Sequence, residues 1–195
     1  MESGVPRLTG LKVICPSTPA DAKGMMKTAI RDNDPVYVME NTTLYGNTGE
    51  VPDPADGDFL IPLGKADIKR EGSDISLIAH GASVLRCLEA ADILANEHNI
   101  DAEVVDLRSI RPLDQNTIIE SVKKTNRAVL VDESKPFCGV SAQITTLIQE
   151  YAFDYLDAPV KRVCTIDAPA IYSPHVEQDQ LPNAKRIVAQ VLTIA

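Results

Sequence analysis

The feature that most constrains the fold is a regular alternation, after residue 66, of short β-rich runs with longer segments of helical period. Residues 74–79 form a near-continuous apolar run, as expected for a strand that is covered on both faces. Similar runs recur at 102–107, 128–131 and 160–166. Helical segments separate these runs, and this order requires crossover helices and a parallel sheet. We therefore predict an α/β fold with a mostly parallel sheet flanked by helices.

Four helices are predicted in the same region from apolar spacing and capping residues. Ser83 and Asp114 are expected to cap the first two, because each short polar side chain directly precedes a periodic apolar segment. A proline-containing loop is expected between the last strand and the last helix. The predicted helical spans are 83–98, 114–124, 139–156 and 183–194.

The first third of the chain has a different organisation. It reads as a strand at 11–15, a helix to about residue 31 that Thr18 caps, and a strand at 35–39. Residues 46–64 are rich in proline, glycine and aspartate, a composition typical of an interdomain linker. One strand, helix and strand are too few to close a core, so the chain is expected to begin inside a domain.

Composition excludes several classes of function. The 19 basic and 28 acidic residues give a formal net charge of −9, which repels polyanions, so neither a nucleic-acid partner nor an anionic membrane surface is expected. No apolar run approaches the length that spans a bilayer. The four cysteines are far apart and are expected to be reduced thiols rather than disulfides or zinc ligands: Cys15, Cys87, Cys138 and Cys164.

The common catalytic motifs are absent: there is no phosphate loop, G-x-G-x-x-G, H-E-x-x-H or nucleophile elbow. His80 follows a strand at the edge where open α/β sheets bind ligands, so it is a candidate acid or base, although bonding to the loop backbone is the more frequent role. Asp132 and Glu133 follow another strand, but adjacent strand residues point to opposite faces, and one is expected to cap the next turn.

Two arginines are further candidates. Asp106 and Arg108 are two residues apart and are expected to share a strand face and form a structural ion pair. Arg111, before Pro112, is a candidate anchor for an anion, although a solvated arginine is the more frequent outcome.

Motifs throughout the chain carry a resemblance to a known family. They include Pro16-Ser-Thr-Pro-Ala-Asp-Ala-Lys-Gly24, Glu40-Asn41 with Leu44-Tyr45-Gly46, Glu103-Val-Val-Asp-Leu-Arg108, Arg111-Pro-Leu-Asp114 and Leu156-Asp-Ala-Pro159. In this order they resemble the beta subunits of thiamine-diphosphate-dependent 2-oxo acid dehydrogenases. The match at residues 40–46 and 110–113 is more similar to the pyruvate enzyme than to its branched-chain relative.

The resemblance implies a division of the chain and an activity. Residues 1–48 correspond to the tail of a pyrimidine-binding domain, 49–65 to a linker and 66–195 to a transketolase-type C-terminal domain. The complete family enzyme decarboxylates pyruvate oxidatively and acetylates lipoyl groups, using thiamine diphosphate and magnesium. The family's cofactor-activating glutamate and its catalytic histidine correspond to positions upstream of residue 1, so this chain alone is expected to be inactive.

The resemblance also implies site residues and partners. A potassium site built from backbone carbonyls corresponds to Ala29, Asp32 and Asp34, and the alternative is a simple helix C-terminus. Asp157 corresponds to a residue that pairs with an arginine of the peripheral-subunit-binding domain of the dihydrolipoyl acetyltransferase, to which the C-terminal carboxylate, here Ala195, also contributes. An alpha subunit and a second beta subunit complete the expected heterotetramer.

Two alternatives to the pyruvate enzyme are open at this point. One is a branched-chain 2-oxo acid dehydrogenase beta subunit. The other is a free-standing flavodoxin-like module with a small ligand near His80 and Asp132. The family implies a bacterial cytoplasmic protein or, in a eukaryote, one of the mitochondrial matrix or plastid.

Overall fold

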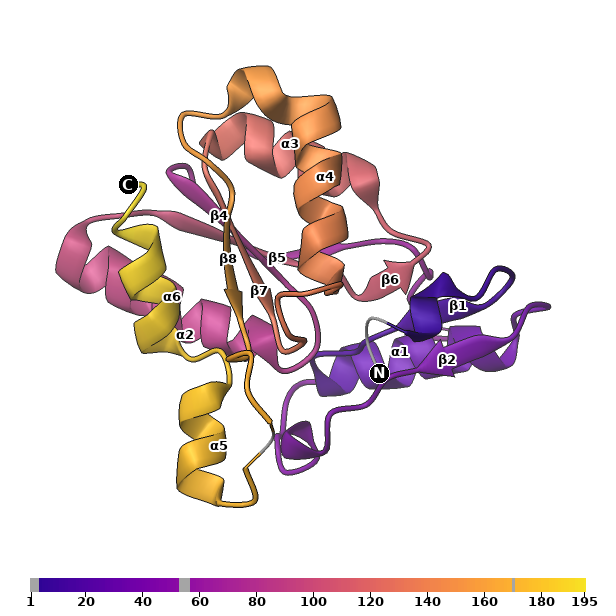
Figure 1. The fold of residues 1–195 in the computed structure, drawn as a ribbon. Helices are drawn as coiled ribbons and strands as arrows, with labels where there is room; N and C mark the ends of the chain where they lie inside the picture. Colours follow the sequence, from indigo (N-terminus) through magenta and orange to yellow (C-terminus); the bar gives the residue numbers. More distant parts are fainter. Residues whose placement is uncertain (1–3, 53–56, 170) are drawn as a thin grey trace.

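The computed structural model describes residues 4–52, 57–169 and 171–195, and it contains two sheets (Figure 1). The strands are β1 Lys12–Ile14, β2 Val36–Val38, β3 Asp67–Arg70, β4 Ile75–Ala79, β5 Ala102–Asp106, β6 Ser109–Arg111, β7 Ala128–Asp132 and β8 Lys161–Cys164. The helices are α1 Pro19–Ile30, α2 Ser83–His98, α3 Gln115–Thr125, α4 Val140–Ala152, α5 Pro174–Gln180 and α6 Ala184–Val191. The 3-10 turns are η1 Val5–Arg7, η2 Thr42–Leu44 and η4 Phe153–Tyr155.

The larger sheet has the strand order β3-β5-β4-β7-β8. The pairs β4·β5, β4·β7 and β7·β8 are parallel, and only the edge strand β3 is antiparallel to its neighbour. Helices α2 and α6 cover one face, while α3 and α4 cover the other (Figure 1). The expected α/β fold with a mostly parallel, helix-flanked sheet is confirmed.

Both faces of this sheet are apolar, which explains the continuous hydrophobic runs in the sequence. Along β4, Leu77 packs with the core under α2 and α6, and Ile78 packs with the core under α3 and α4. Successive strand residues point to opposite faces, so a strand covered twice must be apolar at every position. All five residues of β4 are buried.

The predicted ends of several helices are confirmed by their caps. The Thr18 side chain accepts a hydrogen bond from the Asp21 amide, and the Asp114 side chain accepts one from the Thr117 amide. Helix α2 ends at Asn99, which has the left-handed conformation typical of a C-terminal cap. The prediction for Ser83 is wrong, because Ala82 already has helical dihedral angles and Ser83 is therefore the first residue inside the helix.

Two strands and one α-helix were not predicted: β3, β6 and α5. α5 lies where the sequence suggested a loop, and in Figure 1 it projects below the larger sheet. The helix expected at 139–156 is shorter, because α4 ends at Ala152 and η4 follows. Of the expected linker, residues 53–56 lie outside the described part. No helix in the described ranges is long and apolar enough to cross a membrane.

The smaller sheet, β2-β1-β6, joins the first third of the chain to the rest. β1 pairs parallel with β2 and antiparallel with β6, a strand that follows β5 directly in the chain. The Cys15 amide also donates to the Arg108 carbonyl at 2.7 Å. α1 covers this sheet through a small core that contains Ile14, Met25 and Ile61.

Candidate functional site

Six polar side chains form a network where the two sheets meet, and we call it the junction cluster. It lies at the carboxyl end of β5, an edge at which α/β proteins commonly place functional groups. The first third of the chain supplies two members, and the segment from β3 to Arg108, just past the end of β5, supplies the others. The members are Ser17, Asp21, Asp67, Lys69, Asp106 and Arg108.

Two cations hold the buried carboxylate of Asp21. Lys69 Nζ lies 2.9 Å from Asp21 Oδ2 and 2.8 Å from Asp67 Oδ2. Arg108 Nη2 lies 2.6 Å from Asp21 Oδ1, an ion pair without hydrogen-bond alignment, and 2.9 Å from Asp67 Oδ2. Because Asp21 belongs to α1 and its partners follow residue 64, these contacts fasten α1 to the larger sheet.

The predicted ion pair between Asp106 and Arg108 is wrong. Arg108 has φ of +54° and has left the strand, so the two side chains do not share a face. Its guanidinium pairs with Asp21 and Asp67, and only its backbone amide donates to Asp106 Oδ1, at 2.9 Å. Asp106 Oδ2 instead accepts a hydrogen bond from Ser17 Oγ at 2.5 Å.

The two buried carboxylates of the junction cluster differ in acidity. Burial raises the pKa of Asp106 to about 6, although the Ser17 hydroxyl and the Lys69 ammonium favour its ionised form. Burial also opposes ionisation of Asp21, but hydrogen bonds from Lys69 and Thr18 outweigh it, so the pKa of Asp21 is lowered. A group that titrates near pH 6 therefore lies between the two sheets.

His80 and Asp132 lie together at the ends of β4 and β7. Asp132 Oδ1 accepts a hydrogen bond from the Ser134 amide at 2.8 Å, and Oδ2 accepts one from the Ser141 amide at 2.9 Å. This carboxylate therefore caps the turn that begins α4, as expected for one residue of the Asp132-Glu133 pair. Burial opposes ionisation of Asp132, but the charge of His80 and these amides lower its pKa. His80 is only 5% exposed, which favours a structural role.

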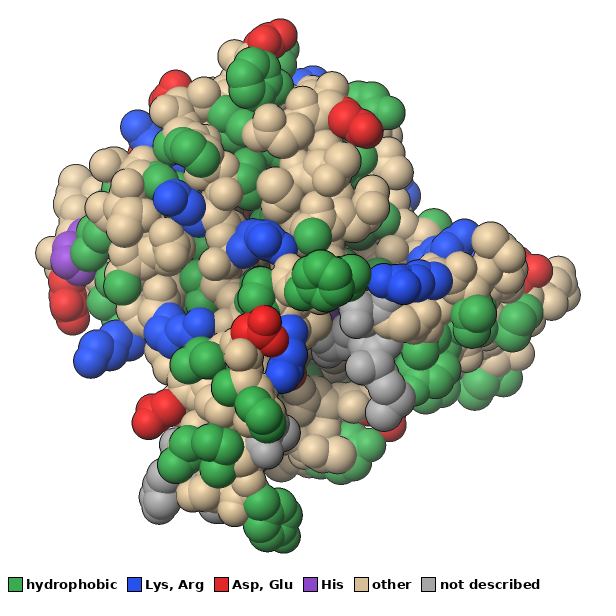
Figure 2. Space-filling model, in the orientation of Figure 1, with side chains coloured by type: hydrophobic (Ala, Val, Ile, Leu, Met, Phe, Trp, Pro, Cys, Tyr) green, Lys and Arg blue, Asp and Glu red, His purple; other side chains and the backbone are tan. Residues whose placement is uncertain are grey.

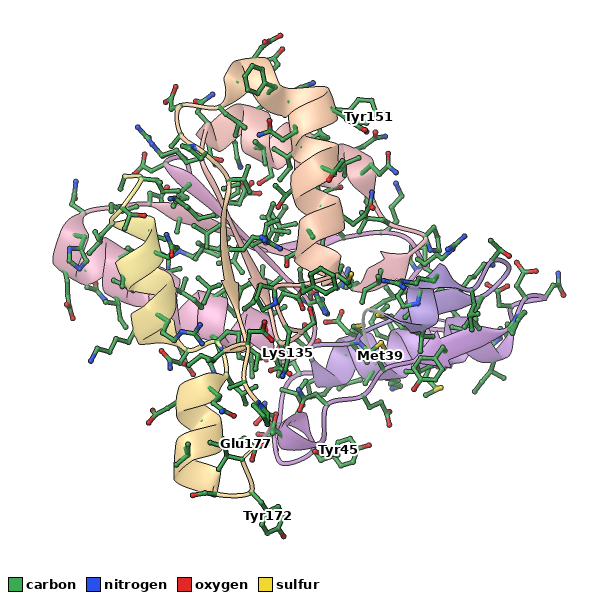
Figure 3. All side chains as sticks on the ribbon, viewed as in Figure 1. Met39, Tyr45, Lys135, Tyr151, Tyr172 and Glu177 are labelled. Atoms are coloured by element: carbon green, nitrogen blue, oxygen red, sulfur yellow. The ribbon has the colours of Figure 1, made fainter. Side chains whose placement is uncertain are left out.

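The second carboxylate of this pair reaches the first third of the chain. Glu133 accepts a hydrogen bond from Asn41 Nδ2 at 2.9 Å, and the Asn41 side chain also caps η2. Figure 3 shows Tyr45, which follows η2, and Tyr172, which precedes α5, both pointing away from the body of the molecule. This side of the molecule thus presents aromatic side chains around the carboxyl edge of the larger sheet.

The three residues expected to bind potassium lie at the end of α1. Asp32 Oδ1 and Oδ2 each lie 2.7 Å from Lys12 Nζ, and Asp34 Oδ2 lies 3.1 Å from the same atom. Both carboxylates thus pair with the single ammonium of Lys12, and their hydrogen bonds raise the pKa of Lys12. The Ala29 carbonyl accepts the Asp32 amide at 3.3 Å. Backbone carbonyls near a helix end retain lone pairs, so the carbonyls of these three residues fit a hard monovalent cation. The carboxylates of Asp32 and Asp34 are not free to bind it, because both pair with Lys12.

The two expected docking residues lie toward the amino end of the larger sheet (Figure 1). The Asp157 side chain is 60% exposed, and its Oδ2 lies 3.7 Å from Arg127 Nη2. Its amide donates to the Asn126 carbonyl at 2.9 Å, next to the start of β7. Ala195 is exposed and its amide donates to the Val191 carbonyl at 3.0 Å.

Sequence reasoning missed Asp21, Asp67 and Lys69 as members of a site. One signal was present, because Asp67, Ile68 and Lys69 alternate polar and apolar side chains, as edge strands often do. Their partner Asp21 lies 46 or more residues away in the chain, and no local pattern predicts such a pairing. Arg111 lies on β6, and its Nη1 donates to the Pro6 carbonyl at 2.5 Å.

Comparison with known families agrees with this geometry. Residues 64–187 match the transketolase C-terminal domain, and residues 4–48 match the transketolase pyrimidine-binding domain. A solved structure described as a split-gene transketolase, inactive beta4 tetramer, superposes with a TM-score of 0.79 at 26% identity, over 96% of this chain and 58% of that one.

Curated relatives are more similar in sequence. The chain is 46% identical over 187 residues to the beta subunit of acetoin:2,6-dichlorophenolindophenol oxidoreductase of Bacillus subtilis, covering 96% of this chain and 54% of that protein. It is 44% identical over 180 residues to the mitochondrial pyruvate dehydrogenase E1 beta subunit of Dictyostelium discoideum, covering 92% and 50%. The chain spans about half the length of these relatives. With most of its residues matched by one domain model, this chain belongs to the transketolase C-terminal domain family.

Proposed function

We propose that this chain is part of the beta subunit of a thiamine-diphosphate-dependent 2-oxo acid dehydrogenase that oxidatively decarboxylates pyruvate and acetylates lipoyl groups. The observation that carries the proposal is the 44–48% identity to pyruvate dehydrogenase beta subunits over at least 92% of the chain. The motifs at residues 40–46 and 110–113 add to it. We expect the protein in the cytoplasm of a bacterium or, in a eukaryote, in the mitochondrial matrix or plastid.

Within that enzyme, the part played by these residues is assembly and docking. An alpha subunit and a second beta subunit would complete the enzyme, and thiamine diphosphate with magnesium supplies the decarboxylation chemistry there. Asp157 supports a docking role because its carboxylate is exposed. Its ion pair with Arg127 is long, at 3.7 Å, so a partner's arginine can compete for the carboxylate. The net charge of −9 suits a basic partner.

Docking is tested by surface plasmon resonance against an immobilised peripheral-subunit-binding domain from a dihydrolipoyl acetyltransferase. Asp157→Asn should weaken binding about tenfold and reduce its salt dependence, because a charge-assisted hydrogen bond contributes about 1.5–3 kcal/mol. Asp154→Asn is the matched control, since Asp154 is an exposed aspartate of neighbouring η4. Binding that neither substitution changes, or that Asp154→Asn weakens equally, would contradict the assignment of Asp157.

A second candidate substrate is acetoin, because two relatives named for acetoin oxidation are 46% and 47% identical to this chain. The assay uses a complete enzyme, assembled from full-length alpha and beta chains in which the beta chain carries these 195 residues. Pyruvate-dependent carbon dioxide release supports the proposal, whereas acetoin-dependent reduction of 2,6-dichlorophenolindophenol without it supports the alternative.

The chain alone is expected to release no carbon dioxide from pyruvate above background, even with thiamine diphosphate and magnesium. The reason is that the family glutamate and histidine that act on the cofactor have no counterpart among these residues. Turnover by the isolated chain would refute this expectation. The carbonyls of Ala29, Asp32 and Asp34 are our proposed potassium ligands, supported by their place at the end of α1.

A further inference from the structure

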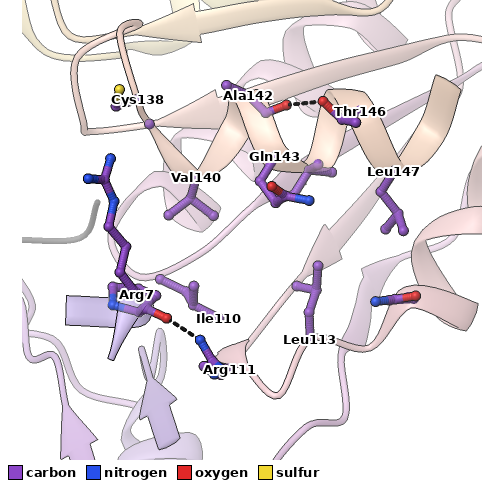
Figure 4. Close-up of a pocket in the computed structure, with 14 residues that line it drawn as sticks. Arg7, Ile110, Arg111, Leu113, Cys138, Val140, Ala142, Gln143, Thr146 and Leu147 are labelled. Atoms are coloured by element: carbon purple, nitrogen blue, oxygen red, sulfur yellow. Dashed lines mark hydrogen bonds between the residues drawn. The ribbon is translucent and has the colours of Figure 1, made fainter. Parts of the chain in front are cut away.

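A cleft of about 570 Å³ opens between α4 and the strand β6 (Figure 4). Its size falls in the range of small-molecule sites, which typically combine an apolar lining with a few placed polar groups. The apolar lining includes Ile110, Leu113, Val140, Ile144 and Leu147. The cleft contains none of the members of the junction cluster and neither of the docking residues.

Two arginines line this cleft, and neither forms an ion pair with an acidic side chain in the part of the chain that the structure describes. Arg111 is half-buried on β6 and is held in place by the Pro6 carbonyl, to which its Nη1 donates at 2.5 Å. Arg7 projects from η1 on the same side as Cys138 (Figure 4). Within residues 4–52, 57–169 and 171–195, no carboxylate lies within ion-pair distance of either guanidinium.

A half-buried guanidinium without a counter-ion pays a desolvation cost that a bound anion would offset. Arg111 retains further N–H groups in a fixed, planar arrangement, which suits a carboxylate. Figure 2 shows Lys and Arg side chains where the body formed by the larger sheet meets the part formed by the smaller sheet, and the lining of the cleft contains two arginines and no acidic residue. The cleft is thus locally basic on a chain whose net charge is −9.

We propose that this cleft binds an amphipathic monocarboxylate, with the carboxylate at Arg111 and Arg7 and the alkyl chain over the apolar lining. The two oxygens of one carboxylate can accept hydrogen bonds from both guanidinium groups, and the overall negative charge of the chain disfavours polyanions. The apolar floor formed by Ile110, Val140 and Leu147 favours an alkyl tail over an inorganic anion. This site is separate from the proposed docking and potassium sites, because neither the docking residues nor the proposed potassium ligands line the cleft.

Calorimetric titration of the 195-residue chain with octanoate tests the proposal, with 1-octanol as the uncharged probe. Octanoate should bind at least about tenfold more tightly than 1-octanol, and Arg111→Gln should remove that difference. Arg162→Gln is the matched control, because Arg162 also donates to a single backbone carbonyl, at 3.0 Å, but does not line the cleft. No octanoate binding, equal binding of the two probes, or an equal effect of the control substitution would overturn the proposal.

A second measurement needs no substitution and decides the question if Arg111→Gln fails to fold. Cys138 lines the cleft and is the only exposed cysteine of the four. Saturating octanoate should slow alkylation of Cys138 by iodoacetamide severalfold, whereas 1-octanol at the same concentration should slow it less. An unchanged alkylation rate with octanoate would overturn the proposal.

Discussion

Asp106 is expected to make the chain less stable as the pH rises through the range from about 4 to 6. Its pKa is about 6 in the folded chain, against 3.8 for an ordinary aspartate. Between these values the folded state binds more protons than the unfolded state, so the free energy of unfolding falls as the pH rises. At about 1.36 kcal/mol per pH unit, the difference corresponds to at most about 3 kcal/mol.

The substitution Asp106→Asn isolates this contribution. Asparagine cannot ionise, so the stability of the variant does not change with the ionisation of residue 106. The variant loses the hydrogen bond from Ser17 and the contact with Lys69, and this loss varies little with pH. Only the wild type loses stability as Asp106 ionises. The difference in unfolding free energy, variant minus wild type, should therefore become more positive by about 2–3 kcal/mol between pH 3.5 and pH 7.5.

Urea denaturation of both proteins, followed by circular dichroism at half-unit pH steps, measures this difference. Asp132→Asn provides a control of opposite sign, because the pKa of Asp132 is lowered: its ionised form contributes stability above pH 4, which is lost as the pH falls. A flat difference for Asp106→Asn, or one that falls with rising pH, would refute the assignment of a raised pKa to the carboxylate between the sheets.

The remaining predictions concern backbone packing and the cation site. Gly72→Ala should lower the free energy of unfolding by at least about 3 kcal/mol, because the added Cβ would lie 2.3 Å from the backbone carbon of Ala102. Gly81→Ala should lower it by only about 1 kcal/mol, because the space around its Cβ is open and only the φ of +56° is unfavourable. Urea melts compare the two variants directly. If the Ala29 carbonyl helps to hold potassium, the thermal midpoint should be higher in potassium chloride than in choline chloride at equal ionic strength, and equal midpoints would count against the site. Lys12→Met should lower the thermal midpoint in either salt, since it leaves the carboxylates of Asp32 and Asp34 facing each other.

The parallel sheet and its covering helices were predictable because their signals are local. A strand buried on both faces must be apolar throughout, and Asp114 and Asn99 mark helix ends by rules that act within a few residues. α5 escaped prediction because its seven residues are mostly polar and show no apolar stripe. β3 escaped because an edge strand with charged side chains resembles a loop.

The junction cluster was not predictable, for a physical reason. Its contacts join residues separated by up to 89 positions in the chain, as for Ser17 and Asp106, so they exist only after both sheets have formed. The expected pairing of Asp106 with Arg108 assumed that the strand continues, and the positive φ of Arg108 breaks that assumption. Because Arg108 has left the strand, its guanidinium pairs with Asp21 of α1 instead of with Asp106.

The strand β6 has a consequence for how the chain responds to cleavage. Although it follows β5 in sequence, it hydrogen-bonds to β1, so residues 49–65 are not the sole connection between the chain before residue 49 and the chain after residue 65. A protease that nicks this stretch would leave two polypeptides that remain together and elute as one particle under native conditions. They would separate only in denaturant, because the hydrogen bonds between β1 and β6 hold the two polypeptides together.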